Sequence, residues 1–273
     1  MAEYRSVVSR DGTEISYAHV GTGPGLVIVP GNNRMAHNYR RLVGELAHRF
    51  AVSVIDRRGR GASGPQGAAY GLDREIEDLR AVQRAEHAGL VFGHSYGGLI
   101  ALQAARGDRR IQQLAVYEPG VSLNGSFDAS FLPEFEELLA ANRHIAAMSL
   151  FLKRTRLTPF PASTPRFVFS ALSALMVGGR NGAEMRSLMP TTPPEIREIM
   201  RLDSDGANYA EITADTLLLG GSKTPTYLTG VLDPLQRMIP TARVAMLDGA
   251  DHNAPDESSP RIVAQRLETF FAG

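Results

Sequence analysis

The chain has 273 residues, of which 43% are hydrophobic, so it can bury the core of one large domain or of a domain with an insertion. Lys plus Arg and Asp plus Glu number 29 each, which leaves no net charge to attract nucleic acid or an anionic membrane. Cysteine is absent, which excludes disulfides, thiolate nucleophiles and sulfur-ligated metals.

The start of the chain and its apolar runs bear on localisation. Residues 1–6 are polar and lack the apolar stretch of a signal peptide. The longest apolar run, around residues 145–152, is too short to cross a bilayer. These features predict a cytoplasmic protein that does not act at a membrane.

Short apolar runs alternate with helix-like segments along most of the chain. Residues 5–20 carry Asp11-Gly12 between two alternating runs, which is typical of a β-hairpin. Continuous apolar runs indicate buried parallel strands, here at 25–29, 51–55, 89–92, 114–117, 216–219 and 244–247. Helices are expected at about 36–48, 73–88, 97–106, 228–238 and 258–271. This alternation predicts an α/β sandwich, with a mostly parallel sheet covered by helices on both faces.

One long stretch, residues 121–209, breaks the alternation. It contains no clear strand and is rich in Leu, Ala, Met, Phe and scattered Pro. We expect several short helices there, because the stretch is too long for a simple connecting loop. The predicted organisation is therefore a core of residues 1–120 and 210–273, with residues 121–209 inserted as a helical cap over the active site.

The segment Gly93-His94-Ser95-Tyr96-Gly97 has the pattern G-x-S-x-G. It follows the expected strand at 89–92 and precedes an expected helix, which is the context of a nucleophile elbow. In such a sharp turn the glycines avoid collisions and the serine hydroxyl projects above the sheet. Ser95 is therefore the predicted nucleophile.

A serine hydroxyl needs an adjacent base to attack at neutral pH. Of the seven histidines, His252 follows the last expected strand, in a loop at the same edge of the sheet as Ser95. His94 adjoins Ser95 but should point away from the reacting face, where it packs or lines the pocket. His252 is therefore the predicted base.

These motifs resemble the α/β-hydrolase family over essentially the whole chain. Residues 56–63, Asp-Arg-Arg-Gly-Arg-Gly-Ala-Ser, are similar to the family's D-x-R-G-x-G-x-S loop after the fourth strand. The same stretch contains G-x-G-x-x-G, but Pro65 follows and no helix is expected to open there for a dinucleotide. Epoxide hydrolases and dehalogenases of this fold have an aspartate at the elbow, and Ser95 argues against both.

The chain departs from the family's usual pattern in the third triad residue. Many members carry an aspartate after the strand here at 216–219, where this chain has Thr224 in Gly-Gly-Ser-Lys-Thr-Pro. The resemblance implies that Glu118, at the end of the neighbouring strand, serves instead. Asp251 and Asp233 are the weaker rivals. This Ser–Glu–His pattern, with Tyr117-Glu118-Pro119 and Thr224-Pro225-Thr226, resembles the zearalenone-hydrolase group of lactonases.

An oxyanion hole in this fold needs two backbone N–H groups. We expect one from Tyr96, directly after the nucleophile, and one from Asn32 in the loop after residue 29. Pro30, in the same loop, has no N–H to donate.

The sequence thus predicts a serine hydrolase that cleaves an ester or lactone of a hydrophobic small molecule. No metal-binding pattern or cofactor motif is present, so none is expected. A carbon–carbon bond hydrolase or lyase, and a binding protein without catalysis, remain alternatives, and a homodimer is left open. Two or three apolar cap residues should line the pocket, from the set Phe127, Phe131, Phe135, Leu139, Met148, Phe151, Phe160, Phe167, Phe169 and Met176.

Overall fold

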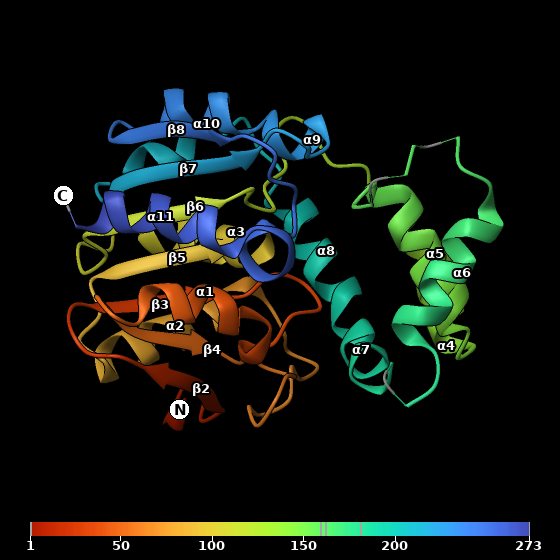
Figure 1. Cartoon of the computed structure of the whole chain (residues 1–273), viewed down its shortest axis with the longest axis horizontal. Helices are drawn as coiled ribbons and strands as arrows, with labels where there is room; N and C mark the ends of the chain where they lie inside the picture. Colours follow the sequence, from red (N-terminus) through yellow and green to blue (C-terminus); the bar gives the residue numbers. More distant parts are fainter. Residues whose placement is uncertain (1, 159, 162, 181, 273) are drawn as a thin grey trace.

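A computed structural model describes residues 2–158, 160–161, 163–180 and 182–272. Within these residues the strands form one eight-stranded sheet in the order β1-β2-β4-β3-β5-β6-β7-β8 (Figure 1). The pairs β1–β2 and β2–β4 are antiparallel and the other neighbours are parallel. The strands are β1 (Glu3–Val8), β2 (Glu14–Val20), β3 (Gly25–Val29), β4 (Ala51–Ile55), β5 (Leu90–His94), β6 (Gln113–Tyr117), β7 (Asp215–Gly221) and β8 (Ala242–Leu247).

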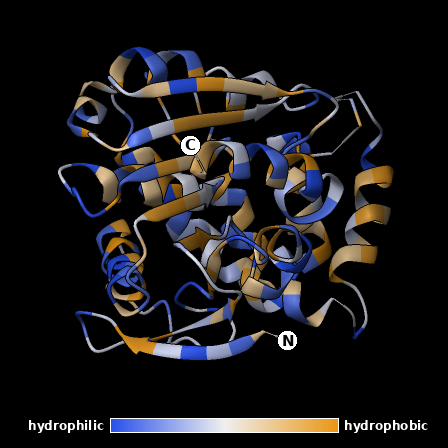
Figure 2. Cartoon of the chain, turned by 60° about the vertical axis from the view of Figure 1, so that its left-hand side comes forward, coloured by the Kyte–Doolittle hydropathy of each residue, from blue (hydrophilic) through white to orange (hydrophobic). Residues whose placement is uncertain are grey.

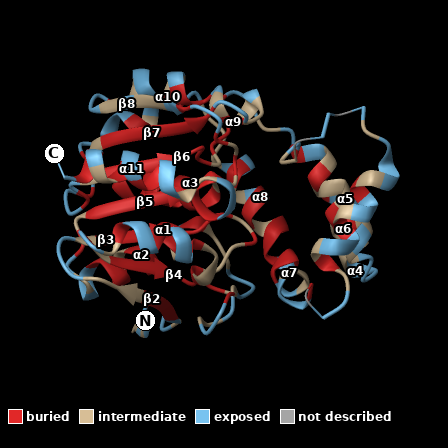
Figure 3. Cartoon of the chain, in the orientation of Figure 1, coloured by how far each residue is buried: buried red, intermediate tan, exposed pale blue. Residues whose placement is uncertain are grey.

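Helices cover both faces of the sheet, so the central strands are buried on both sides (Figure 3). One hydrophobic cluster joins the sheet to α2 (Leu72–Ala85), α3 (Tyr96–Ala105) and α10 (Leu232–Met238). A second joins the opposite face to α1 (Arg40–Leu46) and α11 (Pro260–Phe271). Burial on both faces explains why these strands are continuous apolar runs (Figure 2).

The predicted α/β sandwich is confirmed, and so is the hairpin of β1 and β2. Two predicted helices are each divided. The segment at 36–48 forms a 3-10 turn, η1 (Ala36–Tyr39), before α1, and the segment at 228–238 forms α9 (Thr226–Thr229) and α10. The last helix begins at Pro260, after a π-helical turn, η4 (Ala254–Ser258). Among the described residues, no helix combines the length and apolar character needed to cross a membrane.

Helices also fill the stretch between β6 and β7, at the side of the sheet toward which the parallel strands point (Figure 1). A third hydrophobic cluster is made mostly by their side chains. The division into core and cap at residues 121 and 209 stays a prediction, and its residues 159, 162 and 181, with residues 1 and 273 of the predicted core, lie outside the described part. The elements are α4 (Leu132–Ala140), α5 (His144–Thr155), α6 (Arg166–Val177), α7 (Ala183–Leu188), η2 (Met189–Thr191), α8 (Thr192–Arg201) and η3 (Ala207–Glu211).

The strand order reverses at β3, which pairs with β4 on one side and with β5 on the other. In open α/β sheets, the loops that leave such neighbouring strands at their carboxyl ends diverge and leave a crevice. Here these loops are residues 30–34 after β3 and the turn at Ser95 after β5. The topology therefore brings the two loops together at one edge of the sheet.

Candidate active site

Ser95 occupies the sharp turn between β5 and α3, with φ 54° and ψ −121°. A non-glycine residue with positive φ stores strain, which is common where a side chain must point in one direction for function. The flanking glycines allow the turn. A Cβ on Gly93 would lie 2.5 Å from the carbonyl oxygen of Gly97, and one on Gly97 would lie 2.1 Å from that of Val29. These close approaches explain both glycines of the G-x-S-x-G pattern.

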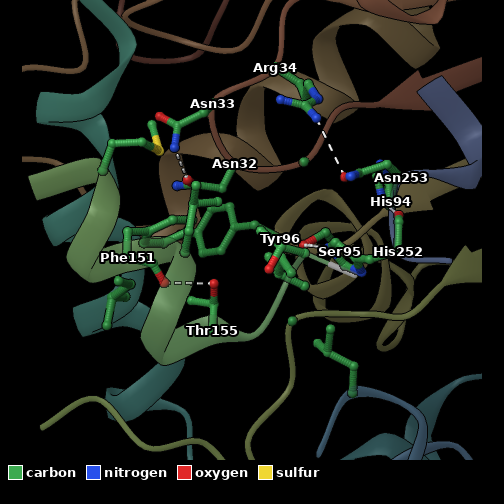
Figure 4. A pocket seen from close by; sticks show the side chains of 18 of the residues that line it. Asn32, Asn33, Arg34, His94, Ser95, Tyr96, Phe151, Thr155, His252 and Asn253 are labelled. Carbon is green, nitrogen blue, oxygen red and sulfur yellow. Dashed lines mark hydrogen bonds between the residues drawn. The ribbon is translucent and has the colours of Figure 1, made fainter. Parts of the chain in front are cut away.

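His252 lies in the loop after β8 and faces Ser95 (Figure 4). Its Nε2 is 3.1 Å from Ser95 Oγ, within hydrogen-bond distance. The histidine is 7% exposed, so little water competes for this contact. The structure therefore brings together the nucleophile and base that the sequence predicts, although 157 residues separate them.

Glu118 follows β6 directly and is fully buried. Its Oε2 lies 2.7 Å from His252 Nδ1, and its Oε1 accepts the backbone N–H of Gly221 at 2.7 Å. Because a carboxylate only accepts hydrogen bonds, the Nδ1 of His252 carries the proton. The lone pair of Nε2 is then left to face Ser95.

The weaker rivals for the acid do not contact His252. Asp251 Oδ1 accepts the backbone N–H of Asn253 and the hydroxyl of Ser258. Asp233 is exposed in the first turn of α10. Thr224, in the loop after β7, stands in place of the family's aspartate, and the backbone N–H that Glu118 accepts comes from Gly221, the last residue of that strand.

His94 is buried behind the reacting groups and lines the cavity, as the sequence predicts. Its Nε2 donates to the carbonyl oxygen of His252 at 2.8 Å. Its Nδ1 must therefore accept from the Tyr39 hydroxyl at 2.7 Å, and that hydroxyl accepts the N–H of Gly31 at 3.0 Å. Burial lowers the pKa of His94 well below its usual range, and the nearby His252 and Arg34 lower it further. A neutral His94 thus links the loop after β3 to the His252 backbone.

The two predicted oxyanion donors lie at the cavity beside Ser95 (Figure 4). Tyr96 begins α3, so its N–H has no acceptor within the helix. The N–H of Gly31 is already taken by Tyr39. The backbone N–H of Asn32 donates to no acceptor among the residues that the structure describes. Asn32 and Tyr96 therefore remain the candidates for the hole.

Four charged side chains, each at most 2% exposed, form a group next to these donors, which we call the buried ion cluster. Glu195 Oε1 accepts Arg57 at 2.6 Å and also accepts Arg60. Arg57 Nη1 lies 3.6 Å from Glu75 Oε1, and burial raises the pKa of the Glu75 carboxyl. This cluster was not predicted from the sequence, although the two arginines at open positions of the D-x-R-G-x-G-x-S loop were a visible signal. Its members are Arg57, Arg60, Glu75 and Glu195.

A mainly apolar cavity of about 400 Å³ contains Ser95 and His252 in its wall. Figure 4 shows Phe151 and Thr155 of α5 across the cavity from them. Of the ten apolar residues proposed for the pocket, four line it: Phe127, Met148, Phe151 and Met176.

The other six do not line it. Phe131, Phe135, Leu139 and Phe169 pack within the third hydrophobic cluster, and Phe160 and Phe167 are 38% and 72% exposed. Across the described ranges, no group of three or more His, Asp or Glu side chains is arranged to hold a metal ion.

Comparison with known proteins covers most of the chain. The model of the "Alpha/beta hydrolase family" matches residues 26–266. An alpha/beta hydrolase from Sphaerobacter thermophilus, solved by crystallography, is 30% identical, with a TM-score of 0.82 over 98% of this chain and 100% of that chain.

Two curated relatives match a shorter region. A cis-3-alkyl-4-alkyloxetan-2-one decarboxylase from Shewanella oneidensis is 34% identical over 124 residues, 42% of this chain and 39% of the relative. An N-formylmaleamate deformylase from Pseudomonas putida is 36% identical over 123 residues, 42% of this chain and 45% of the relative. The chain thus spans less than half the length of both proteins.

Proposed function

The chain belongs to the alpha/beta hydrolase family, and within this family we propose that it is a serine hydrolase that cleaves an ester or lactone of a hydrophobic small molecule through an acyl-enzyme. The observation that carries the proposal is the line of contacts Ser95–His252–Glu118, at 3.1 and 2.7 Å. In this geometry, the base can remove the serine proton while the carboxylate holds the base in the correct tautomer.

Ser95 Oγ attacks the carbonyl carbon as its proton moves to His252 Nε2. The carbon–oxygen double bond opens, and negative charge develops on the carbonyl oxygen. The imidazolium then returns the proton to the leaving alkoxide, which departs as an alcohol. In a lactone, the alcohol stays attached to the acyl group.

A water molecule completes the reaction by the same steps. His252 Nε2 accepts a proton from the water, whose oxygen attacks the acyl carbon. Collapse of the second tetrahedral intermediate returns the proton to Ser95 Oγ and releases the acid. Glu118, which contacts His252 Nδ1, stabilises the imidazolium that forms twice in the cycle.

The Asn32 and Tyr96 N–H groups are proposed to bind the developing oxyanion. Such donors favour the transition state because the charge appears only as the tetrahedral intermediate forms. Removing one donor typically lowers the rate by roughly 10²–10³.

The cavity supports a hydrophobic substrate. Its volume of about 400 Å³ lies within the usual range for small-molecule sites. Phe127, Met148, Phe151 and Met176 line it from the segment between β6 and β7, which we propose is the cap of the active site.

A lactone is the narrower proposal. The Ser–Glu–His arrangement and the Thr224-Pro225-Thr226 loop resemble the zearalenone-hydrolase group. The relative from Shewanella oneidensis is named for an oxetan-2-one with two alkyl groups, which is a lactone ring with apolar substituents. Both observations favour a cyclic ester.

Turnover of a matched substrate panel tests the proposal. The panel contains aliphatic and aromatic lactones, linear p-nitrophenyl esters of increasing chain length, and β-diketones as carbon–carbon substrates. We expect hydrolysis of esters or lactones, with one ¹⁸O atom from labelled water in the acid product. Turnover of the diketones alone would favour a carbon–carbon hydrolase, and no turnover together with tight ligand binding would favour a binding protein.

A further inference from the structure

Both proposed oxyanion donors are connected through their side chains to the buried ion cluster. Asn32 Nδ2 donates to Glu195 Oε2 at 2.6 Å, and the guanidinium carbon of Arg57 lies 4.9 Å from the ring centroid of Tyr96. We propose that Glu195, on α8, is a positioning residue for the oxyanion hole and acts through Asn32. This inference rests on the proposed function, because it assigns a role within the same reaction.

The Asn32 side chain is held at both of its polar atoms. Glu195 accepts hydrogen bonds only, so the amide nitrogen of Asn32 must face it. The amide oxygen then accepts Asn33 Nδ2 at 2.6 Å (Figure 4), and the Thr192 hydroxyl lies 3.2 Å from the same oxygen. Turning this side chain would break every one of these contacts. The backbone N–H of the same residue is therefore held in one direction.

Glu195 is itself held in one position. Its Oε1 accepts Arg57 and Arg60, both of which come from the loop after β4, and its side chain is 1% exposed. Its Oε2 is thus left to face Asn32. Since Glu195 and Thr192 both belong to the first turns of α8, this helix carries both partners of the Asn32 side chain.

A contribution to folding stability alone does not explain the buried ion cluster. Burying paired charges costs free energy, and well-packed apolar residues in their place are often as stable or more stable. The pattern D-x-R-G-x-G-x-S leaves positions 57 and 60 open, yet this chain has arginine at both. In the described part of the chain, Arg57 Nε, Arg57 Nη1 and Arg60 Nε lack a hydrogen-bond partner. A role in positioning the oxyanion donors explains why charged residues occupy this buried position.

Glu195→Gln should disturb the Asn32 N–H donor, because it places a hydrogen-bond donor where the Asn32 side chain needs an acceptor. The amide oxygen of the glutamine would turn to the two arginines, so its NH₂ group would face Asn32 Nδ2, donor against donor. Turning the Asn32 amide over would set its NH₂ group against Asn33 Nδ2, so the Asn33 amide would have to turn as well, and the Thr192 hydroxyl would lose both of its amide acceptors. We expect the Asn32 backbone to shift as these side chains rearrange, and a displacement near 1 Å at a reacting centre can lower a rate on the order of 100-fold.

The experiment measures kcat and KM per active site on p-nitrophenyl butyrate, with active sites counted by titration with a fluorophosphonate. For Glu195→Gln we expect kcat to fall by roughly 10- to 100-fold, with KM changed less than about threefold. The binding of a trifluoromethyl ketone, whose adduct places an oxyanion in the hole, should weaken by the same factor as kcat. A purely structural role would lower the number of titrated sites and leave kcat per site unchanged.

Glu198→Gln is the matched control. It is the same substitution on the same helix, and Glu198 also contacts the core, through the N–H of Leu72 at 2.8 Å. It does not touch Asn32, so its kcat per site should stay within about twofold of the wild type.

A double-mutant cycle tests the route through Asn32. Asn32→Ala keeps the backbone N–H but removes the amide that Glu195 holds, so it should lower kcat by itself. If Glu195 acts through this amide, adding Glu195→Gln to Asn32→Ala should lower kcat little further. Additive losses would overturn the proposal.

If Glu195→Gln does not fold, Asn32→Ala and Thr192→Val carry the test, because both leave the ion cluster intact. Wild-type kcat per site in these two variants would contradict the inference. Different results would reject the proposed function and the positioning role of Glu195. Turnover by Ser95→Ala would reject the proposed function, whereas an inactive Ser95→Ala with unchanged kcat in Glu195→Gln would reject only the positioning role.

Discussion

Glu118 Oε2 lies 2.7 Å from His252 Nδ1, while the other oxygen of the same carboxylate accepts the N–H of Gly221. The glutamate is fully buried and has a positive φ of 44°, a strained conformation for a residue with a side chain. One carboxylate thus fixes the tautomer of the base and binds the backbone at the end of β7. Many members of the family have an aspartate in the loop after that strand.

Glu118→Gln should lower kcat by roughly 10⁴, as the loss of the orienting acid does in other triads. The Gly221 N–H needs an acceptor, so the glutamine oxygen would turn to it and the NH₂ group would face His252 Nδ1. The histidine would then carry its proton on Nε2, toward Ser95, and could not act as base. Steady-state turnover of a p-nitrophenyl ester measures this loss.

Asp233→Asn and Asp251→Asn are the controls for this prediction. Asp251 adjoins His252 in sequence and Asp233 lies on α10, but neither side chain contacts His252, so we expect kcat within about threefold of the wild type. If Asp233→Asn instead causes the large fall in kcat, the assignment of the acid to Glu118 is wrong.

His94 should make the folded state sensitive to acid. Its pKa is held well below the ordinary value near 6.5, mainly by burial, whereas in the unfolded chain it titrates normally. Between these two pKa values the unfolded state binds more protons, so the free energy of unfolding falls as the pH drops below about 6.5. One such group changes that free energy by about 1.4 kcal/mol per pH unit.

His94→Gln tests this contribution, because glutamine can accept from Tyr39 and donate to the His252 carbonyl without titrating. Urea unfolding at a series of pH values from 5 to 8 should give a flatter profile below pH 6.5 in the variant. The neighbouring groups Asp256, Arg34 and His252 are present in both proteins, so the two profiles differ through the loss of His94 and of its interactions with them. Parallel profiles would show that His94 does not carry the acid sensitivity.

The phenylalanines that line the cavity should set the preference for large substrates. Phe151→Ala and Phe127→Ala should raise KM for bulky esters by roughly 10- to 100-fold, since losing contact with a buried phenyl ring costs about 1.5–3 kcal/mol. KM for acetate esters, whose acyl group ends in a single methyl, should change little. Phe167→Ala, at a position 72% exposed, should leave both unchanged. Equal losses on small and large esters would remove the rings from the substrate contact.

Local sequence patterns were sufficient to predict the sheet and to select Ser95 and His252. Strands buried on both faces are continuous apolar runs, and an elbow needs glycines at fixed spacing around its serine. Placing Glu118 next to His252 also needed a resemblance, because no local pattern relates residues 134 positions apart.

Other contacts have no corresponding pattern in the sequence. Glu195 and Asn32 are 163 residues apart, and a glutamate in a helix normally indicates a solvent-exposed face. Which apolar residues between β6 and β7 line the cavity could not be predicted either. Helical spacing identifies the buried faces of a helix but not which of them borders a cavity. Phe131 and Phe135 pack inside the third cluster, whereas Phe151 of the neighbouring helix lines the site.

The proposed function depends on Ser95 being a nucleophile that His252 activates. Its most direct test treats the protein with a fluorophosphonate and locates the adduct by mass spectrometry of the peptides. We predict a single adduct on Ser95, lost in Ser95→Ala and formed far more slowly in His252→Ala, together with a fall in ester turnover on the order of 10⁶ in Ser95→Ala. An unlabelled Ser95, or a tenth or more of the wild-type rate in Ser95→Ala, would contradict the account.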